Sequence, residues 1–183
     1  MSDHITTYTR EIFYPLEPEI EKINVEDIAH ALSLTCRANG HIHSFFSVAQ
    51  HSINCAKEAK AKGCSNRIQL ACLLHDASEA YISDITRPVK KELLEYLVIE
   101  ERLQGMIYNK YFSPALNDKE FEVVKEIDDA MLYCEFMNFM ELKVFDNPPA
   151  IMCEPKFNFE QFENVEKKFL ELFRQLFQKL NIK

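Results

Sequence analysis

The chain of 183 residues carries 21 basic and 29 acidic residues, for a net charge of −8, and 47% of it is hydrophobic. That length supports one hydrophobic core, so we expect a single domain spanning residues 1–183. The acidic balance disfavours a nucleic-acid polymer as a partner, because gripping a phosphate backbone requires a basic face. A small phosphorylated substrate is not excluded, since a bound cation can reverse the field locally.

Glycine is scarce in this chain, with three residues in all, and tryptophan is absent. Sandwiches and barrels need many tight turns, so the composition predicts an all-α fold of long helices joined by short loops. The first stretch, ITTYTREIFYPLEP, is rich in threonine and aromatic residues and predicts a short N-terminal β-hairpin.

The chain shows no signature of secretion or of membrane insertion. Its N-terminus lacks the apolar region of a signal peptide, and no apolar run approaches membrane-spanning length. Six cysteines are spread along the sequence without a CxxC pair. We therefore expect a cytoplasmic protein with reduced thiols and no membrane partner.

Capping residues predict where the first helices begin. Asn24 suits the N-cap of a helix through VEDIAHALSLTCRA. Ser47 with Gln50 forms a capping box that opens a helix through SVAQHSINCAKEAKAK, which Gly63 ends. Asn66, with a glutamine three residues on, predicts a second capping box, at the start of a helix through RIQLACLLHDASEAY.

Three further helices are predicted toward the C-terminus. Pro88 suits the first turn of a long charged helix running toward Tyr111, and another helix is expected from about Asp118 to Met140. After the loop DNPPAIMCEP, a last helix is expected over about 158–182. Apolar residues recur in it at helical spacing and predict a packing face, in the core or at a subunit seam: Phe162, Val165, Phe169, Leu172, Phe173, Leu176 and Leu180.

The positions of the histidines in these predicted helices are the most informative feature of the sequence. His51 lies one turn into the second helix, and His75 and Asp76 lie late in the third. Glu79 follows one turn further along that helix, and Asp84 lies in the loop after it. Imidazole nitrogens and carboxylate oxygens together suit borderline divalent metals such as Mn, Fe, Co, Ni or Zn.

Taken singly, these residues are weak signals. A lone histidine is more often a packing residue than a ligand, and a His-Asp dipeptide is common by chance. However, LACLLHDASEAY places both polar residues at the end of an otherwise apolar helix, where burying an unpaired charge is costly. A cation beside them removes that cost, so the context favours a metal site.

A further carboxylate lies within an apolar stripe of the predicted helix 118–140. Asp128 shares that stripe, whereas Asp129 is rotated about a third of a turn away. An acidic residue inside an apolar stripe indicates a ligand or an error in the helix register, in which case Asp129 is the alternative. The stripe consists of Val124, Asp128, Met131, Leu132 and Glu135.

Three segments, taken together, resemble a known family. DIAHALSLTCRANGHIHSFFSVAQHS, LLHDASEAYISDITRPVK and VKEIDDAMLYCE are similar in order, spacing and helical placement to the HD-domain metal-dependent phosphohydrolases. The closest group is the 5′-deoxynucleotidase-like one, which includes many small phage and prophage proteins. The resemblance covers about Tyr8 to Glu135 and implies a single-domain HD-type helical bundle. Its motif-bearing core would span about 24–140, with the last helix outside it.

The resemblance implies a metal centre with one divalent cation, of the Mn, Co, Zn, Fe or Ni kind. The motif histidine, the His-Asp pair and a distal aspartate are the metal ligands of that family. In this sequence they correspond to His51, His75, Asp76 and Asp128.

The resemblance also implies catalytic and substrate-binding residues. The family's catalytic glutamate matches Glu79, which would orient or deprotonate the attacking water, and Asp84 would assist proton transfer or accept a hydrogen bond from the sugar. Arg37 would clamp the phosphate, because a guanidinium offers paired donors to oxyanions. Lys90 would add a second positive charge, although it or Lys91 is equally well explained as the solvated start of a helix.

One departure from the family pattern concerns the two residues after the arginine. The family often has a bulky residue and glycine there, where this chain has Ala38 and Asn39. The contacts to the base or the sugar are therefore not carried over, while the metal site is intact.

The expected function is hydrolysis of small nucleotides, most directly 5′-deoxynucleoside monophosphates, by a homo-oligomer. All six histidines lie at or before position 75, whereas bimetallic HD enzymes need additional histidines downstream. The alarmone hydrolases carry a Glu-Asp pair after the signature, where this chain has Glu79 and Ala80. These two differences favour a nucleotidase with a single metal ion.

Two alternative functions stay open. One is a deoxynucleoside triphosphate triphosphohydrolase, which extra cationic side chains around the site would favour. The other is a non-catalytic module that binds nucleotides or holds a structural zinc. Such a zinc site would combine the two histidines with two cysteines of the same helices: His51, Cys55, Cys72 and His75.

Overall fold

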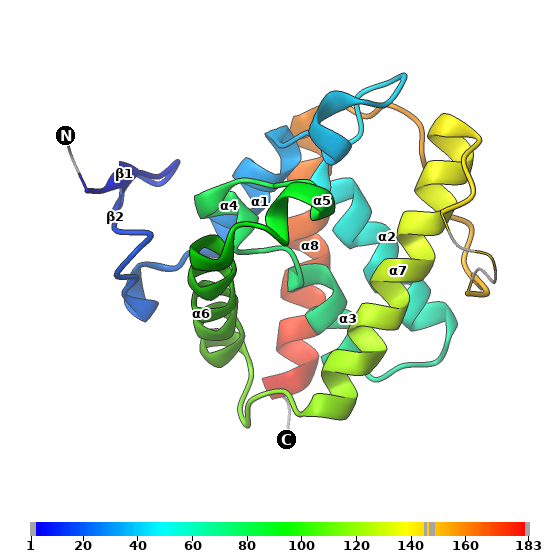
Figure 1. Ribbon diagram of the computed structural model, residues 1–183. Helices are drawn as coiled ribbons and strands as arrows, with labels where there is room; N and C mark the ends of the chain where they lie inside the picture. The colour runs from blue at the N-terminus through cyan, green and yellow to red at the C-terminus, as the bar shows by residue number, and fades with distance from the viewer. Residues whose placement is uncertain (1–2, 145, 147–148, 182–183) are drawn as a thin grey trace.

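The computed structural model describes residues 3–144, 146 and 149–181, and it confirms an all-α fold with a short N-terminal hairpin. No helix in this described part is long and apolar enough to cross a bilayer. The elements in chain order (Figure 1) are β1 (Ile5–Thr6), β2 (Ile12–Phe13), η1 (Ile20–Lys22), α1 (Val25–Leu34), η2 (Arg37–Gly40), α2 (Val48–Ala61), α3 (Asn66–Leu74), α4 (Glu79–Ile82), α5 (Arg87–Lys90), α6 (Leu94–Tyr111), α7 (Asp118–Met140) and α8 (Phe162–Asn181).

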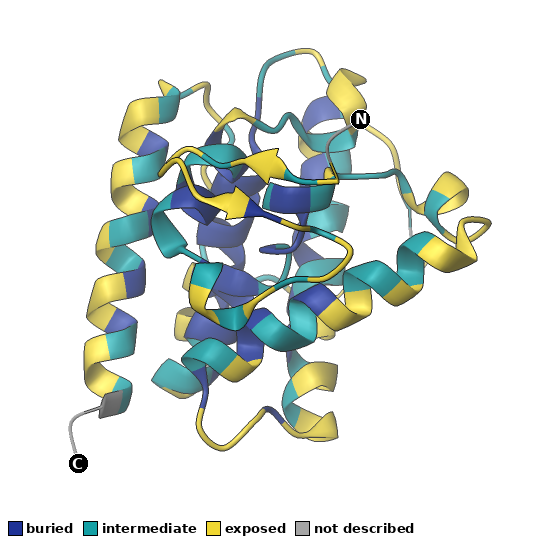
Figure 2. Ribbon diagram, turned by 90° about the vertical axis from the view of Figure 1, so that its left-hand side faces the viewer, coloured by how far each residue is buried: buried dark blue, intermediate teal, exposed yellow. Residues whose placement is uncertain are grey.

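The C-terminal helix α8 lies at the edge of the bundle with one face exposed (Figure 2), and its other face packs against α1, α2 and α3. It begins at Phe162, four residues later than about 158, and the predicted end at 182 lies outside the described residues. The predicted packing face is confirmed as core, and Figure 2 shows the buried residues gathered where the helices face one another. Its fully buried members are Val165, Phe169, Phe173 and Leu176.

The predicted N-terminal hairpin is present and is tied to the helices by side-chain contacts. The strands β1 and β2 pair in antiparallel fashion, and the buried ring of Phe13 stacks on Tyr81 with a centroid distance of 4.2 Å. In the loop between them, the backbone N–H and the hydroxyl of Thr9 donate to the Asp27 carboxylate at 2.7 and 2.9 Å. The hairpin is therefore anchored although most of its surface is exposed (Figure 2).

Most of the predicted helix starts agree with the structure. The Asn24 side chain caps α1, and Ser47 with Gln50 forms the complete capping box of α2, which ends just before Gly63. The bounds of α7, Asp118–Met140, are those predicted. Local side-chain hydrogen bonds decide these positions, which is why the sequence reveals them.

The first helix ends earlier than predicted, at Leu34. The chain after it pairs with the segment before α2: the Arg37 N–H donates to the Phe46 carbonyl at 2.9 Å, and the Val48 N–H donates to the Thr35 carbonyl at 3.0 Å. Backbone groups used in this pairing cannot continue the helix. The pairing brings Arg37 next to the beginning of α2.

The predicted capping box at Asn66 is wrong. Ser65 is the N-cap, with an extended backbone, and its hydroxyl accepts from the Ile68 N–H at 3.3 Å. Asn66 is already helical, and the Gln69 amide donates to the Cys64 carbonyl instead of reaching back to an N-cap N–H. An N-cap requires non-helical backbone angles, which Asn66 does not have.

The single helix predicted through LACLLHDASEAY is divided into α3 and α4. A glutamine from α6 bridges the break: the Gln104 amide donates to the Leu74 carbonyl at 2.8 Å and accepts from the Ser78 N–H at 3.0 Å. These bonds replace helical ones at the junction. His75 and Asp76 therefore lie in the turn after α3, and Glu79 opens a separate short helix.

The long helix predicted from Pro88 to Tyr111 is also divided, into α5 and α6. Pro88 occupies the first turn of α5 as predicted, but the chain turns after that helix and restarts at Leu94. The turn folds α5 back over α6, so that the Lys90 ammonium contacts Glu100 at 2.7 Å. Helical periodicity in the sequence cannot predict this ion pair, because its two residues belong to different helices.

The break between α3 and α4 depends on Gln104, so replacing this residue tests its role. We expect Gln104→Ala to lower the free energy of unfolding by about 1–2 kcal/mol, because the Ser78 N–H loses its acceptor and the Leu74 carbonyl keeps only the Ala77 N–H. Urea denaturation followed by circular dichroism measures this. The control is Gln178→Ala on the exposed side of α8, which should change stability by under about 0.5 kcal/mol. Equal stability of the two variants would contradict the assignment.

Candidate metal centre

Three segments bring their polar side chains together at one point between the helices. His51 comes from the first turns of α2, His75 and Asp76 come from the turn after α3, and Asp128 comes from the middle of α7. His51 is fully buried, while His75, Asp76 and Asp128 keep side-chain exposures of 9%, 19% and 18%. The cluster is therefore shielded from solvent on the α2 side, and its other three side chains are partly accessible to solvent.

The ligand-type atoms of these four residues converge. The His51 Nε2 atom lies 3.2 Å from His75 Nε2, 3.1 Å from Asp128 Oδ1 and 3.8 Å from Asp76 Oδ2. His75 Nε2 lies 3.1 Å from Asp76 Oδ2 and 3.6 Å from Asp128 Oδ1. Ligand atoms bound at about 2.0–2.2 Å around one cation lie roughly 3–3.5 Å apart, so the observed separations fit such a donor set.

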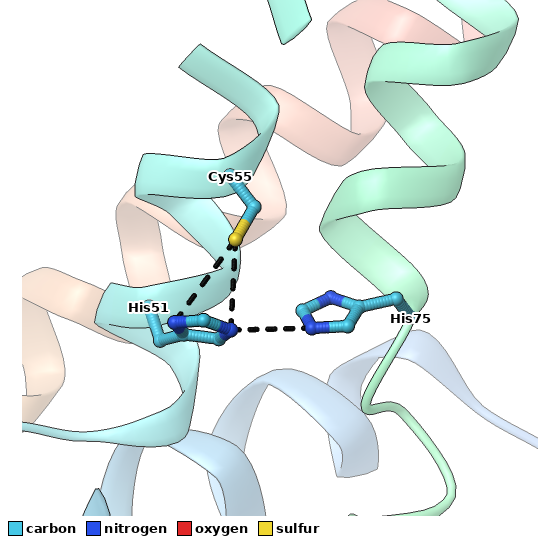
Figure 3. Close-up of side chains that lie close together, drawn as sticks. All are labelled: His51, Cys55 and His75. Atoms are coloured by element: carbon cyan, nitrogen blue, oxygen red, sulfur yellow. Dashed lines mark hydrogen bonds between the residues drawn. The ribbon is translucent and has the colours of Figure 1, made fainter. Parts of the chain in front are cut away.

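A cysteine lies on the inner side of the two imidazoles. Figure 3 shows His51 and Cys55, one turn apart on α2, facing His75. The Cys55 sulfur is 3.5 Å from His51 Nε2, and these three side chains form a candidate metal-binding group. Burial raises the pKa of the Cys55 thiol well above its usual value, so the thiol is protonated at neutral pH. A protonated thiol is a poorer ligand than the two carboxylates on the other side.

The four-residue zinc site with Cys72 is not assembled in the described part of the chain. Cys72 contributes its backbone: the Nδ1 atom of His75 lies 2.8 Å from the Cys72 carbonyl oxygen, and the thiol is outside the candidate group. A carbonyl can only accept, so His75 donates from Nδ1. In the neutral ring this leaves the Nε2 lone pair directed toward the centre, as metal-binding histidines require.

Glu135 was not predicted as a functional residue, although it shares the stripe of Asp128. It is buried at 4% exposure, and its Oε1 lies 2.6 Å from His51 Nδ1. Its other oxygen accepts from the Arg37 guanidinium at 3.2 Å. A carboxylate on one imidazole nitrogen fixes the ring and directs the other nitrogen inward. The sequence did contain an indication of this role, because a second acid seven residues after Asp128 lies on the same face of the helix.

The charges at the centre support one another. Burial opposes the ionised form of Asp128, but hydrogen bonds that His51 and His75 donate from Nε2, when these nitrogens are protonated, hold its pKa well below the usual value. A bound cation would replace these protons and leave both rings neutral, with Nε2 as the ligand atom. Burial likewise opposes ionised Asp76, and the neighbouring His75 outweighs it and lowers that pKa. Both carboxylates are therefore ionised at neutral pH, which is the form that binds a cation.

Glu79 has the opposite electrostatics. Burial, together with the negative charges of Asp76 and Asp84, raises its pKa to about 9. One carboxyl oxygen lies 3.5 Å from the Lys90 ammonium, and the other is buried without a hydrogen-bond partner among the described residues. A buried acid with a displaced pKa at the edge of a cavity is typical of proton-transfer groups.

A cavity of about 310 Å³ adjoins the centre, and six of the eight predicted site residues line it, all except His51 and His75. Its charged lining residues are Arg37, Asp76, Glu79, Asp84, Arg87, Lys90, Asp128 and Glu135. Its apolar lining includes Ala38, Ile42, Phe46, Ile85, Leu132, Phe136, Phe139 and Met140. Along α7 the lining passes from Asp128 at a polar end to Phe139 and Met140 at an aromatic end. A cavity of this size and mixed lining suits a small amphiphilic molecule.

The predicted cations are held by carboxylates at the polar end. The Arg37 guanidinium hydrogen-bonds Glu135 and lies 3.6 Å from Asp76, so it is fixed at the inner side of the cavity. Lys90 lies between Glu79 and Glu100. Both side chains are mostly shielded, with 13% and 19% exposure, and both reach the cavity.

Arg87 is a third cation, which the sequence did not reveal. Its guanidinium contacts Asp128 Oδ2 at 2.8 Å and Asp129 Oδ1 at 2.9 Å, and its side chain is 58% exposed at the cavity mouth. Asp129 thus pairs with Arg87 at the surface, whereas Asp128 faces His51 as the helical stripe predicted. Arg87 is the first residue of the four-residue helix α5, and no sequence pattern marks it as a site residue.

The sequence matches no protein-family model. It is 36% identical over 110 residues to uncharacterized protein YfdR of Escherichia coli (strain K12), which covers 60% of this chain and 59% of that protein. It is also 36% identical over 107 residues to uncharacterized protein RCAP_rcc00048 of Rhodobacter capsulatus, covering 55% of this chain and 54% of that protein. The chain therefore spans less than two thirds of the length of these two relatives.

Two single variants loaded with Mn, Co or Zn distinguish a metal site that uses the carboxylates from one that uses Cys55. We expect Cys55→Ser to keep the metal content of the unmodified chain, because the protonated thiol contributes little, and Asp128→Asn to lose most of it. Elemental analysis after gel filtration measures both. A Cys55→Ser protein that loses its metal while Asp128→Asn keeps it would assign the site to the His51, Cys55 and His75 group.

Proposed function

We propose that this chain is an HD-type metal-dependent phosphohydrolase that acts on small deoxynucleotides, with 5′-deoxynucleoside monophosphates as the main substrates. The observation that supports this most is the convergence of two imidazoles and two carboxylates at the polar end of a nucleotide-sized cavity. The four side chains are His51, His75, Asp76 and Asp128, the set that the resemblance to HD-domain hydrolases implies.

These four residues would hold one divalent cation. Two imidazole nitrogens and two ionised carboxylates suit Mn, Fe, Co, Ni or Zn, and the Glu135 contact to His51 supplies the orienting partner that such ligands need. The chemistry that a bound cation supplies is a lowered pKa of coordinated water, from about 15.7 toward about 7, and polarisation of a phosphoryl oxygen.

Arg37 would hold the phosphate of the substrate. Two hydrogen bonds to Glu135 fix the guanidinium plane, and its Nη1 atom lies 3.6 Å from Asp76 Oδ2. A fixed guanidinium next to the metal ligands can donate to phosphoryl oxygens without losing side-chain freedom on binding. Its charge also offsets the negative charge that develops on the phosphoryl group in the transition state.

Glu79 would move the proton. Water attacks phosphorus, the bond from phosphorus to the 5′ oxygen breaks, and the proton of the water passes through the Glu79 carboxylate to the leaving oxygen. A nearby divalent charge favours the carboxylate form, which counteracts the burial that raises the Glu79 pKa. Asp84, at the same edge of the cavity, would accept a hydrogen bond from the sugar or assist this transfer.

The aromatic end of the cavity supports a nucleoside as the remainder of the substrate. Phe46, Phe136 and Phe139 line this end. A planar base packs well against aromatic and aliphatic side chains, whereas a bare phosphate or a sugar phosphate would leave this surface uncovered.

A second candidate function is release of triphosphate from deoxynucleoside triphosphates. Arg87 favours it, because it adds a third, exposed cation at the cavity mouth. A cation at the metal site would compete with Arg87 for the Asp128 carboxylate and weaken its hold. The guanidinium could then contact additional phosphates.

A screen of deoxynucleoside mono-, di- and triphosphates with Mn, Co and Zn tests the proposal. We expect phosphate release from monophosphates and little action on DNA or RNA, and we expect Asp76→Ala to lose both metal and turnover. Arg87→Ala separates the two candidates, because it should weaken a triphosphatase strongly and a monophosphatase little. Wild-type protein that is inert toward every nucleotide with each metal would refute the proposal.

The role of Glu79 makes a separate prediction. Glu79→Gln should keep the metal content and the melting temperature but lower turnover by about 10²–10⁴-fold, as removal of a proton-transfer group does. The matched control is Glu101→Gln on the exposed side of α6, which should keep full activity. If metal content falls in step with turnover, Glu79 is a ligand and its proposed role is wrong.

A further inference from the structure

A second cavity, of about 370 Å³, lies on the other side of α2 from the metal centre, between α2, α8 and the segment 152–160 that precedes α8. We call this cavity the lysine groove and the segment 152–160 the strap. Four of the groove's lining residues are lysines, although the whole chain carries a net charge of −8: Lys57, Lys60, Lys156 and Lys168.

The positive charge in the lysine groove is only partly neutralised. Glu160 pairs with Lys168, and Glu171 is the other acidic lining residue. No described carboxylate lies within ion-pair distance of the other three lysines. Burial, and then the like charges of Lys156 and Lys168, lower the pKa of Lys57. An anion in the groove would relieve this repulsion.

Buried amides hold the strap against α2 and so position one wall of the groove. The Asn54 amide donates to the Lys156 carbonyl at 3.1 Å and accepts from the Lys156 N–H at 3.5 Å. The Gln50 amide donates to the Asn158 carbonyl at 3.2 Å. Asn54 and Gln50 are both buried, with 2% and 6% exposure. Lys156 therefore projects from a fixed backbone and not from a loose loop.

The strap also touches the wall of the first cavity. Phe157, next to Lys156, packs against Phe46 and Phe139 with centroid distances of 5.8 and 5.5 Å. Phe46 and Phe139 line the aromatic end of the cavity beside the metal centre. Anything that steadies the strap at Lys156 therefore also steadies that aromatic wall.

We propose that the lysine groove is a second binding site, for a small phosphorylated ligand, and that its occupation further steadies the strap behind the aromatic wall. Ammonium groups are good partners for phosphate oxygens, and the cavity volume is that of a small-molecule site. A long polyanion would meet the repulsion of the acidic remainder of the surface. The proposal does not depend on the catalytic function proposed above.

Titration of the full chain with inorganic triphosphate, followed by isothermal calorimetry, tests the site. The groove variant is Lys57→Glu with Lys156→Glu, and the control is Lys119→Glu with Lys125→Glu on the exposed side of α7, which changes the net charge equally. We expect at least about tenfold weaker binding in the groove variant and unchanged binding in the control. The binding should also weaken with added salt.

Two further variants control for misfolding and for binding of triphosphate at the candidate metal centre. Lys57→Gln with Lys156→Gln removes charge without reversing it, so it provides a milder test if the glutamate variant folds poorly. Arg37→Ala should retain the groove binding, which separates this site from the metal centre. Triphosphate that does not bind, or that binds the groove variants as tightly as the control, would overturn the proposal.

The coupling to the strap has its own measurement. Hydrogen exchange of the backbone amides of residues 152–160 should slow when triphosphate is bound, in the unmodified chain and in Asp76→Ala alike. Asp76→Ala is expected to lack turnover, so slowed exchange in this variant would show that the effect does not require catalysis. The test of the strap is therefore independent of the catalytic proposal. Exchange that is unchanged by bound triphosphate would overturn the proposed steadying of the strap.

Discussion

The burial of His51 is the constraint on which the rest of the site depends. Its ring is fully enclosed, with Nδ1 2.6 Å from the Glu135 carboxylate and Nε2 facing Asp128 and His75. Buried charges are tolerated only when they are paired, so α2, α7 and the turn after α3 must meet around this imidazole. Arg37 completes the pairing from the segment between α1 and α2, because it neutralises the second oxygen of Glu135.

The break after α3 gives the centre its shape. In a continuous helix, side chains of successive residues such as His75 and Asp76 point about 100° apart. In the turn that Gln104 stabilises, the His75 Nε2 and Asp76 Oδ2 atoms lie 3.1 Å apart and face the same point. A glutamine from α6, nearly thirty residues away in sequence, thus supports the geometry of a predicted metal-binding pair.

The helix α2 serves both cavities with its opposite faces. One face presents His51 and Cys55 to the candidate metal centre, and the other presents Asn54 and Lys57 to the lysine groove. The acidic centre and the basic groove are separated by the width of this one helix. Because Asn54 also holds the strap by hydrogen bonds, the structure offers a short physical connection between the groove and the aromatic wall of the first cavity.

The sequence alone determined the all-α class, most helix starts, the packing face of α8 and the inward orientation of Asp128, because capping bonds and helical periodicity are local properties. Only the tertiary structure decided the two helix breaks, the role of Glu135 as partner of His51, the exposed Arg87 at the mouth and the gathering of four lysines in one groove. Each of these depends on residues that are distant in sequence, and pairing between distant side chains leaves no periodic pattern along the chain.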